Sequence, residues 1–191
     1  METHGTYHLA DNAKQFEVQR SNNFEFIVSF DKAMKRAGYN SEVAETIDAR
    51  QAQEVLRLSV VSASVPSFSQ EVITIKRGNS VIKSAGVPSF SSGSLKVNDF
   101  IGADDKSVLY AWQRLSYDVS SDTVGSMADY KKDCTLIEYT PDYKQVRYWE
   151  LKGCWISELS EEPFDMNNGD KREISATIQY DRAIPHMPDD E

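Results

Sequence analysis

Segments of β-type residues, separated by glycine, proline and serine turns, limit this chain to few folds. Each segment is rich in valine, isoleucine, threonine and aromatic residues, which is typical of strands. The segments are residues 24–30, 55–65, 70–76, 81–86, 87–90, 93–101, 132–140, 145–152 and 173–180. Because helical patterns are scarce between them, they do not read as strands joined by crossover helices. We therefore predict a mainly β protein, an antiparallel β-sandwich or barrel.

The clearest local prediction is a hairpin of residues 132–140 and 145–152. Pro141 and Asp142 open its turn, because proline presets φ and the aspartate carboxylate can bond the backbone. Gly153 is predicted to break the second strand, after which an acidic loop leads into the last strand. The earlier segment 55–65 is predicted to be a long strand that Pro66 closes, because proline has no N–H for a sheet.

One flanking α-helix is predicted after residue 104. Val108, Leu109, Trp112 and Leu115 fall on one face at helical spacing. An aspartate at 104 or 105 can cap its start, and a negative charge there also complements the helix dipole. The residues from 116 to 129 are expected to form a polar loop.

Residues 31–54 are polar and long for a connection between strands. Two helical turns could run to Gly38, and Ser41 could cap a second helical piece. The segment could be a solvated surface helix, or an arm that orders against a neighbouring subunit. Both interpretations stay open, and the second predicts that the segment is disordered in the free monomer.

The predicted domain limits place a flexible N-terminal arm at 1–22, one β-sandwich domain at 23–183 with the 31–54 insertion, and an acidic, loose tail at 184–191. No apolar run approaches the roughly 20 residues that span a bilayer, so no membrane association is expected. The first residues lack the pattern of a secretory signal, so synthesis and folding in a cytoplasm are expected. Cys134 and Cys154 are expected to be buried, reduced thiols.

The sequence contains no recognisable catalytic signature. His4, His8 and His186 lie in end segments, where a general base is poorly held. The acidic clusters have the pattern of solvated surface charge, and the one stretch similar to a calcium loop lacks its bidentate glutamate. We therefore expect no enzyme, no cofactor and no metal site.

The net charge of −9 argues against a protein that grips nucleic acid, because gripping requires an excess of Lys and Arg. An acidic wall would instead repel a phosphate backbone and let it pass without sticking. A soluble acidic surface without such a role is the simpler explanation of the charge.

A series of short motifs runs in a fixed order from about residue 55 to residue 183. These motifs are Ala63-Ser-Val-Pro66, Val97-Asn-Asp-Phe100, Leu109-Tyr-Ala-Trp112, Tyr130-Lys-Lys132, Trp149-Glu-Leu-Lys-Gly-Cys-Trp155, Pro163-Phe-Asp165 and Glu173-Ile-Ser-Ala-Thr-Ile-Gln-Tyr-Asp181. Their order resembles the tail tube proteins of contractile-tailed bacteriophages. The lysine-glycine step before a tryptophan and the closing strand are the most specific parts of this resemblance.

The resemblance implies a structural virion protein. Such subunits form hexameric rings that stack into a hollow tube inside a contractile sheath, and the lumen conducts DNA on ejection. The expected partners are further copies of the chain, the tail sheath protein, the baseplate, the tail terminator and the tape measure protein. The expected location is the virion tail, after assembly in the host cytoplasm. Self-association would also cover sheet edges that otherwise promote aggregation.

The candidate residues fall into three groups. Alternation along the strands suggests lumen-facing positions, although it does not separate the lumen from the outer surface; these are Thr74, Lys76, Glu138, Glu150 and Lys152. The predicted contacts for ring stacking or neighbouring subunits are Met34, Tyr39, Val43, Ile47 and Asp165. The predicted core scaffold is Trp112, Trp149, Gly153 and Trp155.

Three alternatives stay open. The chain could be the tube protein of a type VI secretion-like system or of a tailocin, which share this architecture. It could be a monomeric carbohydrate-binding sandwich, which would expose aromatic side chains and would not self-associate. It could also be an enzyme acting on a polymer, which would need a pocket with paired carboxylates.

Overall fold

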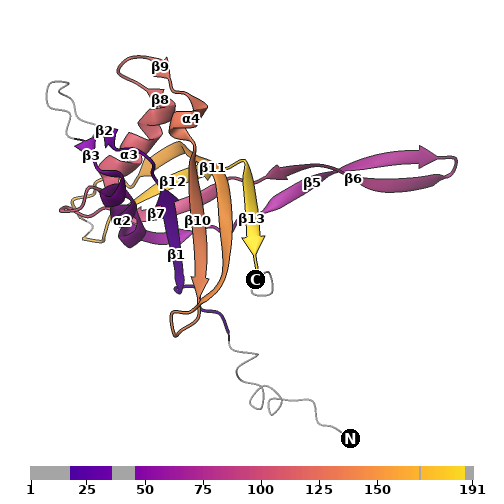
Figure 1. Cartoon of the computed structure of the whole chain (residues 1–191), viewed down its shortest axis with the longest axis horizontal. Coiled ribbons are helices and arrows are strands. Elements are labelled where there is room, and N and C mark those ends of the chain that lie inside the picture. The colour runs from indigo at the N-terminus through magenta and orange to yellow at the C-terminus, as the bar shows by residue number, and fades with distance from the viewer. Residues whose placement is uncertain (1–17, 36–45, 168, 188–191) are drawn as a thin grey trace, which may run out of the picture.

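The computed structural model describes residues 18–35, 46–167 and 169–187. In this part of the chain the strands pair antiparallel, which confirms the predicted mainly β fold. A single path of pairing runs β1-β10-β11-β12-β7-β4, and β13 pairs with β11 beside it. Strand β11 joins two layers, because its first half pairs with β10 and β13 and its second half with β12. Figure 1 shows the two layers crossing, with α2 and α3 at one side.

The two layers are named here by their strands. The first sheet consists of β1 (Phe24–Ser29), β10 (Lys132–Tyr139), the first half of β11 (Gln145–Glu161) and β13 (Arg182–His186). The second sheet consists of the second half of β11, β12 (Glu173–Gln179), β7 (Gly93–Asn98) and β4 (Val60–Ala63). Strand β11 is therefore the element around which both sheets are arranged.

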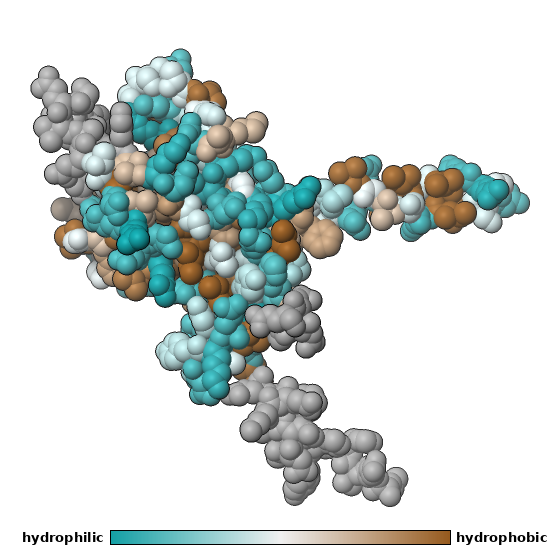
Figure 2. All heavy atoms as spheres, in the orientation of Figure 1, coloured by the Kyte–Doolittle hydropathy of each residue, from teal (hydrophilic) through white to brown (hydrophobic). Residues whose placement is uncertain are grey.

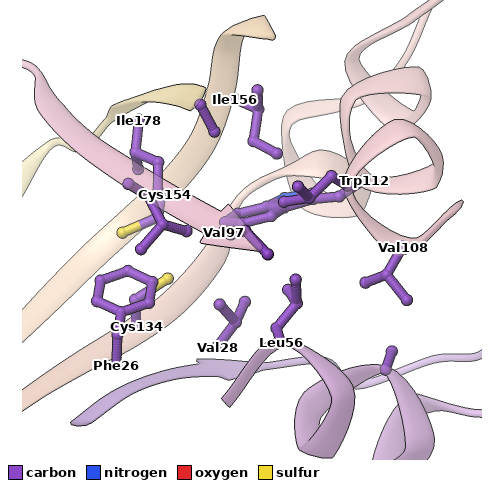
Figure 3. Packing of buried hydrophobic residues seen from close by; sticks show 14 of the residues in the cluster. Phe26, Val28, Leu56, Val97, Val108, Trp112, Cys134, Cys154, Ile156 and Ile178 are labelled. Atoms are coloured by element: carbon purple, nitrogen blue, oxygen red, sulfur yellow. The ribbon is translucent and has the colours of Figure 1, made fainter. Parts of the chain in front are cut away.

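The core lies between the facing sides of the two sheets (Figure 3). Side chains alternate between the two faces of a strand, so every second residue points inward. The buried apolar residues of the sheets include Phe26, Val28, Leu95, Val97, Cys134, Leu136, Leu151, Cys154, Ile156, Ile174, Ala176 and Ile178. Burying each large aliphatic side chain contributes about 1.5–3 kcal/mol, so this layer is the main source of stability.

Helix α3 (Asp105–Ser116) confirms the predicted flanking helix. Val108, Leu109 and Trp112 are buried on its inner face, and Leu115 packs against the core. The Trp112 indole donates a hydrogen bond to the Tyr130 carbonyl at 3.1 Å, which satisfies its polar atom. The helix is thereby anchored to the core by its one tryptophan.

Asp105 places a carboxyl group inside this core. It is fully buried at the start of α3, and burial raises the pKa of its carboxyl above the usual value. Backbone N–H groups nearby, including that of Lys106, offset part of this rise without reaching ordinary hydrogen-bond geometry. The folded chain therefore holds this proton more tightly than the unfolded chain, and this stabilising effect is lost as the pH rises through the raised pKa.

We expect Asp105→Asn to raise the free energy of unfolding at about pH 7, because the raised pKa of the buried carboxyl makes the wild-type fold less stable there than at acidic pH. The gain should shrink toward about pH 3, where the carboxyl is mostly protonated in both the folded and the unfolded chain. Urea unfolding at both pH values measures this difference. Asp142→Asn, at an exposed turn position, controls for the loss of one charge. A variant that is less stable than wild type at neutral pH would contradict the expectation.

The prediction of a long strand at 55–65 is wrong. Helix α2 (Ala49–Ser59) occupies its first part, and only β4 extends beyond it as strand. Asp48 caps the helix by accepting a hydrogen bond from the Arg50 N–H at 3.2 Å. Ala52, Leu56 and Ser59 are buried, which is the spacing of one helical face.

The polar segment 31–54 differs from expectation as well. Met34–Lys35 (β2) and Thr46–Ile47 (β3) pair as two short antiparallel strands, so the two helical turns expected over residues 31–37 are wrong for the described residues 31–35. The structure places the start of a helix at Ala49. The expected helical piece after Ser41, the Gly38 break and residues 36–45 as a whole lie outside the described residues.

The prediction that Gly153 ends its strand is wrong, because β11 continues through this residue. Gly153 has a φ of +69°, and the backbone bulges there as the strand passes from one sheet to the other. The prediction of a loose tail from residue 184 is wrong for 184–186, because β13 pairs with β11 there. Residues 188–191, like 1–17 at the other end, lie outside the described part.

The remaining elements are short or project outward. The expected polar loop contains β8 (Tyr117–Asp118), β9 (Thr123–Val124) and a helical turn, α4 (Met127–Tyr130). Strands β5 (Phe68–Arg77) and β6 (Ser80–Phe90) form a separate hairpin, in which β6 unites two segments that were expected to be separate. No described helix has the length and apolarity needed to cross a bilayer.

Candidate assembly surfaces

The β5–β6 hairpin extends well beyond the body of the molecule (Figure 1). Every residue of β5 is exposed, and so is nearly all of β6. The ten residues of β5 make it about 34 Å long at about 3.4 Å per residue. Figure 2 shows apolar side chains along this projection. The exposed large hydrophobic residues are Phe68, Val72, Ile73, Ile75, Val81, Ile82 and Val87.

The pairing of β5 with β6 gives the hairpin two different faces. Ile75 lies opposite Ile82, and Ile73 and Arg77 share that side of β5 because side chains alternate. We call these four residues the isoleucine face. Thr74 and Lys76 lie on the opposite side, where Lys83 is the partner of Thr74. The isoleucine face is therefore aliphatic with one terminal arginine, whereas the opposite face mixes lysines with Val72 and Val81.

The five predicted lumen residues do not lie on one surface. Thr74 and Lys76 are on the projecting hairpin, whereas Glu150 and Lys152 are on the outer side of the first sheet. Glu138 shares the opposite side of that sheet with Leu136 and pairs with Arg147 there. The five residues were chosen because they are polar and lie in predicted strands. The strand pairing places them on three surfaces, namely the hairpin and the two sides of the first sheet.

A chain of charges crosses the outer side of the first sheet. The Lys152 ammonium contacts Asp133 at 2.9 Å and Glu150 at 2.5 Å, and His186 lies 3.7 Å from Glu150. The hydrogen bond from Lys152 lowers the pKa of Glu150, and its two carboxylate partners raise the pKa of Lys152. The His186 ring stacks on Tyr148 with centroids 4.3 Å apart. The charged groups of this surface are therefore paired with one another within the same sheet.

The predicted stacking residues have different environments. Met34 and Ile47 are 3% and 4% exposed in the core of their own chain, so their side chains offer little surface to a neighbour. Tyr39 and Val43 lie outside the described residues. Asp165 is exposed in a turn, where its carboxylate accepts a hydrogen bond from the Asn167 N–H at 2.9 Å.

The predicted scaffold residues surround the crossing of β11. Trp112 is fully buried, and Trp149 is partly buried against the core. Trp155 is half-buried, with its ring edge-on to Tyr130 at 5.8 Å between centroids. A side chain at Gly153 would approach the Asp181 carboxylate to 2.3 Å. Of the three tryptophans, only Trp112 is a member of the buried cluster.

An ion-pair network joins the loop after β7 to the loop between β11 and β12. Arg172 contacts Asp99 at 3.0 Å and Glu161 at 3.2 Å, and it donates to the Glu162 carbonyl at 2.9 Å. Glu161 also accepts hydrogen bonds from Lys106 and Tyr110, both at 2.6 Å. The bond from Tyr110 raises the pKa of that phenol to about 12. The network fixes both loops to the start of α3.

The reactive side chains of the described residues are either scattered, already paired or buried. They contain no group of three or more His, Cys, Asp or Glu side chains placed to hold a metal. A pocket of about 310 Å³ lies near the hairpin turn of the first sheet. Its Glu25 carboxylate is already engaged by Arg57 and by the Tyr139 hydroxyl at 2.8 Å. Cys134 and Cys154 are both buried, and burial raises the pKa of the Cys134 thiol, which keeps it unreactive.

The family model for the T4-like virus tail tube protein gp19 matches residues 22–183. The match spans most of the chain and contains both sheets up to the start of β13. The chain belongs to this family of tail tube proteins. The resemblance inferred from its motifs is thus confirmed, and no curated protein matches the sequence in addition.

Solved structures support the tail tube fold. A chain of the sheath–tube complex of an extracellular contractile injection system, PVC, in the extended state has a TM-score of 0.62 and 18% identity, with 97% of this chain and 99% of that chain covered. A chain of the anti-feeding prophage cap that terminates the tube has a TM-score of 0.62 and 16% identity, covering 93% and 99%. A chain of the anti-feeding prophage baseplate has a TM-score of 0.60 and 10% identity, covering 90% and 97%. At these identities the likeness concerns the fold.

Sequence reasoning missed the isoleucine face of the tail tube hairpin. The signal was present, because five large apolar residues stand in two short runs of this segment; they are Val72, Ile73, Ile75, Val81 and Ile82. A strand that is apolar on one side normally faces a core, and here none of the residues that the structure describes covers it. Sequence reasoning also missed that Phe164 and Met166, on either side of Asp165, are exposed.

Proposed function

We propose that this tail tube protein assembles into closed hexameric rings that stack into a hollow tube. In this proposal the tube lies inside a contractile sheath and conducts DNA during ejection. The observation that carries the proposal is the projecting β5–β6 hairpin with its exposed isoleucine face. The role is structural, and catalysis forms no part of it.

The hairpin supports assembly because it is poorly suited to a free monomer. A two-stranded ribbon is marginally stable alone in water and needs a packed face. Seven large hydrophobic side chains are exposed along this one, a concentration that marks an interaction surface. A contact between unlike surfaces of identical subunits closes into a ring or continues as a filament. Repeated engagement of such hairpins accounts for a polymer.

The sheets also offer edges for lateral association. Strands β1 and β4 end the main path of pairing, and β13 is paired only with β11 among the described strands. Unpaired edges can accept a strand from another copy. We propose that such lateral contacts complete each ring, and that polar residues of one sheet, including Glu150 and Lys152, face the lumen. Residues 31–54 and the Asp165 loop are proposed as further subunit contacts.

The proposed partners follow the assemblies named for the structural neighbours. Those chains come from a sheath–tube complex, a tube-terminating cap and a baseplate. We propose corresponding sheath, terminator and baseplate contacts here, together with a tape measure protein inside the growing tube. The net charge of −9 favours a lumen from which DNA is repelled and not bound. The proposed location is the virion tail, with assembly in the host cytoplasm.

Electron microscopy and sedimentation of the purified chain over a wide concentration range test the proposal. Rings or tubes with a central channel are expected for the intact chain. A variant with residues 71–87 replaced by a short glycine-containing turn should remain monomeric and folded, because the hairpin makes no part of the core. An intact chain that stays monomeric throughout, even with preformed tube ends as seeds, would contradict the proposal.

A further inference from the structure

Four exposed apolar side chains lie on the two loops that the Arg172 network joins. Ile101 and Met166 are fully exposed, Phe164 is 84% exposed and Phe100 is 46% exposed. We call these four residues, with Glu162 and Asp165 beside them, the loop-pair surface. Large apolar side chains gathered in this way on a soluble chain mark a site of protein contact.

This surface is held in place by the folded body. The Asp99 N–H donates to the Arg172 carbonyl at 3.0 Å, and the two side chains form an ion pair. The Arg172 guanidinium also lies over the Phe164 ring, 3.8 Å from its centroid. The loops are therefore positioned before any partner arrives, which lowers the ordering cost of binding.

The charge of the loop-pair surface is opposite to that of the hairpin. Residues 161–171 contain four acidic residues and one lysine. Neither Glu162 nor Asp165 forms an ion pair with any residue in the described part of the chain. Residues 68–90 contain three basic residues and one acidic residue, in a chain that is strongly acidic overall.

The isoleucine face is complementary to the loop-pair surface in apolar character and in charge. Ile73, Ile75 and Ile82 provide an aliphatic patch, and Arg77 lies on the same face next to the hairpin tip. Arg77 has no ion-pair partner within the described residues. An aliphatic patch with one terminal guanidinium is complementary to four exposed apolar side chains flanked by two carboxylates.

We propose that the isoleucine face of one copy docks on the loop-pair surface of a second copy, with Arg77 paired to Asp165 or Glu162. The contact joins two different surfaces of the same chain. Each copy can therefore bind one neighbour through its hairpin and another through its loop-pair surface, and the contact can repeat from copy to copy. This inference rests on the proposed tube assembly and names the acceptor of its hairpin. It also gives the Asp165 loop a defined partner.

Charge reversal tests the contact. Arg77→Glu and Asp165→Arg, each alone, should raise the concentration needed for tube assembly by at least about tenfold, because like charges then meet at every interface. The double variant should return that concentration to within about threefold of wild type, because an opposite pair is restored with its polarity exchanged. Lys83→Glu, on the other side of the hairpin, is the matched control and should have a smaller effect that Asp165→Arg does not rescue.

Cross-linking gives a second, independent measurement. A chain carrying both Arg77→Cys and Asp165→Cys should form intermolecular disulfides in assembled tubes and give a ladder of multimers on a non-reducing gel. The native thiols are buried and should not contribute. A pair of Arg77→Cys with Ser157→Cys, an exposed position on the second sheet, is the control.

The outcomes separate this inference from the proposed function. Tubes that form normally but show neither rescue nor cross-links would overturn the docking site and leave tube assembly intact. Asp165→Arg chains that assemble normally yet fail to bind a sheath protein would assign the loop-pair surface to that partner and also overturn the inference. A wild-type chain that forms no assembly under any condition would remove the basis of both.

Discussion

Replacing Trp112 with alanine is expected to destabilise the protein by about 3–5 kcal/mol, a large part of the stability of a typical domain. The side chain is 1% exposed at the meeting point of α3 and the two sheets. Phe30 packs edge-on against its ring, with centroids 5.6 Å apart. Truncation leaves a cavity that neighbours from several elements cannot fill. Chemical denaturation followed by circular dichroism measures the loss.

Two further variants separate the sources of that loss. Trp112→Phe keeps most of the buried ring but leaves the Tyr130 carbonyl without the indole donor, so a smaller loss of about 1–3 kcal/mol is expected. Trp155→Ala is the matched control, because Trp155 is half-buried and outside the core cluster. Equal losses for Trp112→Ala and Trp155→Ala would show that burial does not decide the contribution of these tryptophans.

Substituting Gly153 by alanine is expected to cost about 1–3 kcal/mol. The backbone there has a φ of +69°, which disfavours any residue with a Cβ atom. The new Cβ would also lie 2.3 Å from the Asp181 carboxylate, which pairs with Lys131 at 2.7 Å. The carboxylate must therefore move and weaken that ion pair. Denaturant unfolding at constant pH gives the difference in free energy.

The conformational and steric parts of this cost can be measured separately. In an Asp181→Ala background the clash is absent, so Gly153→Ala should cost less there, and the remainder reports the strain in φ. Gly102→Ala is the control, because Gly102 has an ordinary φ and open space around it. A loss at Gly153 no larger than that at Gly102 would refute the role of this glycine in the bend of β11.

Local patterns predicted the elements that carry their own signals. The hairpin at 132–152 was recognisable from alternation and a proline-aspartate turn, and α3 from four apolar residues at helical spacing. The order of motifs was enough to identify the tail tube family. These features depend on residues close together in the chain, so their pattern can be recognised in the sequence before the fold is known.

The failure at 55–65 has a physical reason. Leucine and valine alternate there with polar residues in a way that favours a strand, while the helical stripe of α2 contains only one large apolar residue, Leu56. Intrinsic propensity distinguishes the two states weakly. Burial of Leu56 and Ala52 against the core decides for the helix, and that burial depends on residues far away in the sequence.

The candidate surfaces could be predicted only in part. Asp165 was identified from its motif, but Phe164 and Met166 gain meaning only because Arg172 and Asp99 bring their loop beside Phe100 and Ile101. The five lumen candidates share polarity and strand position, which do not reveal the sheet face to which each belongs. Which polar residues share a surface is a property of strand pairing across the whole chain.

The sequence by itself determined the family, the antiparallel β class, the position of α3 and the lack of a catalytic motif. Only the tertiary structure decided that β11 crosses Gly153 without ending, that β13 pairs beside it, and that the isoleucine face is left exposed by the described part of the chain. The division follows from the range of the interactions. Turns and periodic stripes are set by neighbours in sequence, whereas pairing, burial and exposure are set by distant segments that meet only in the folded molecule.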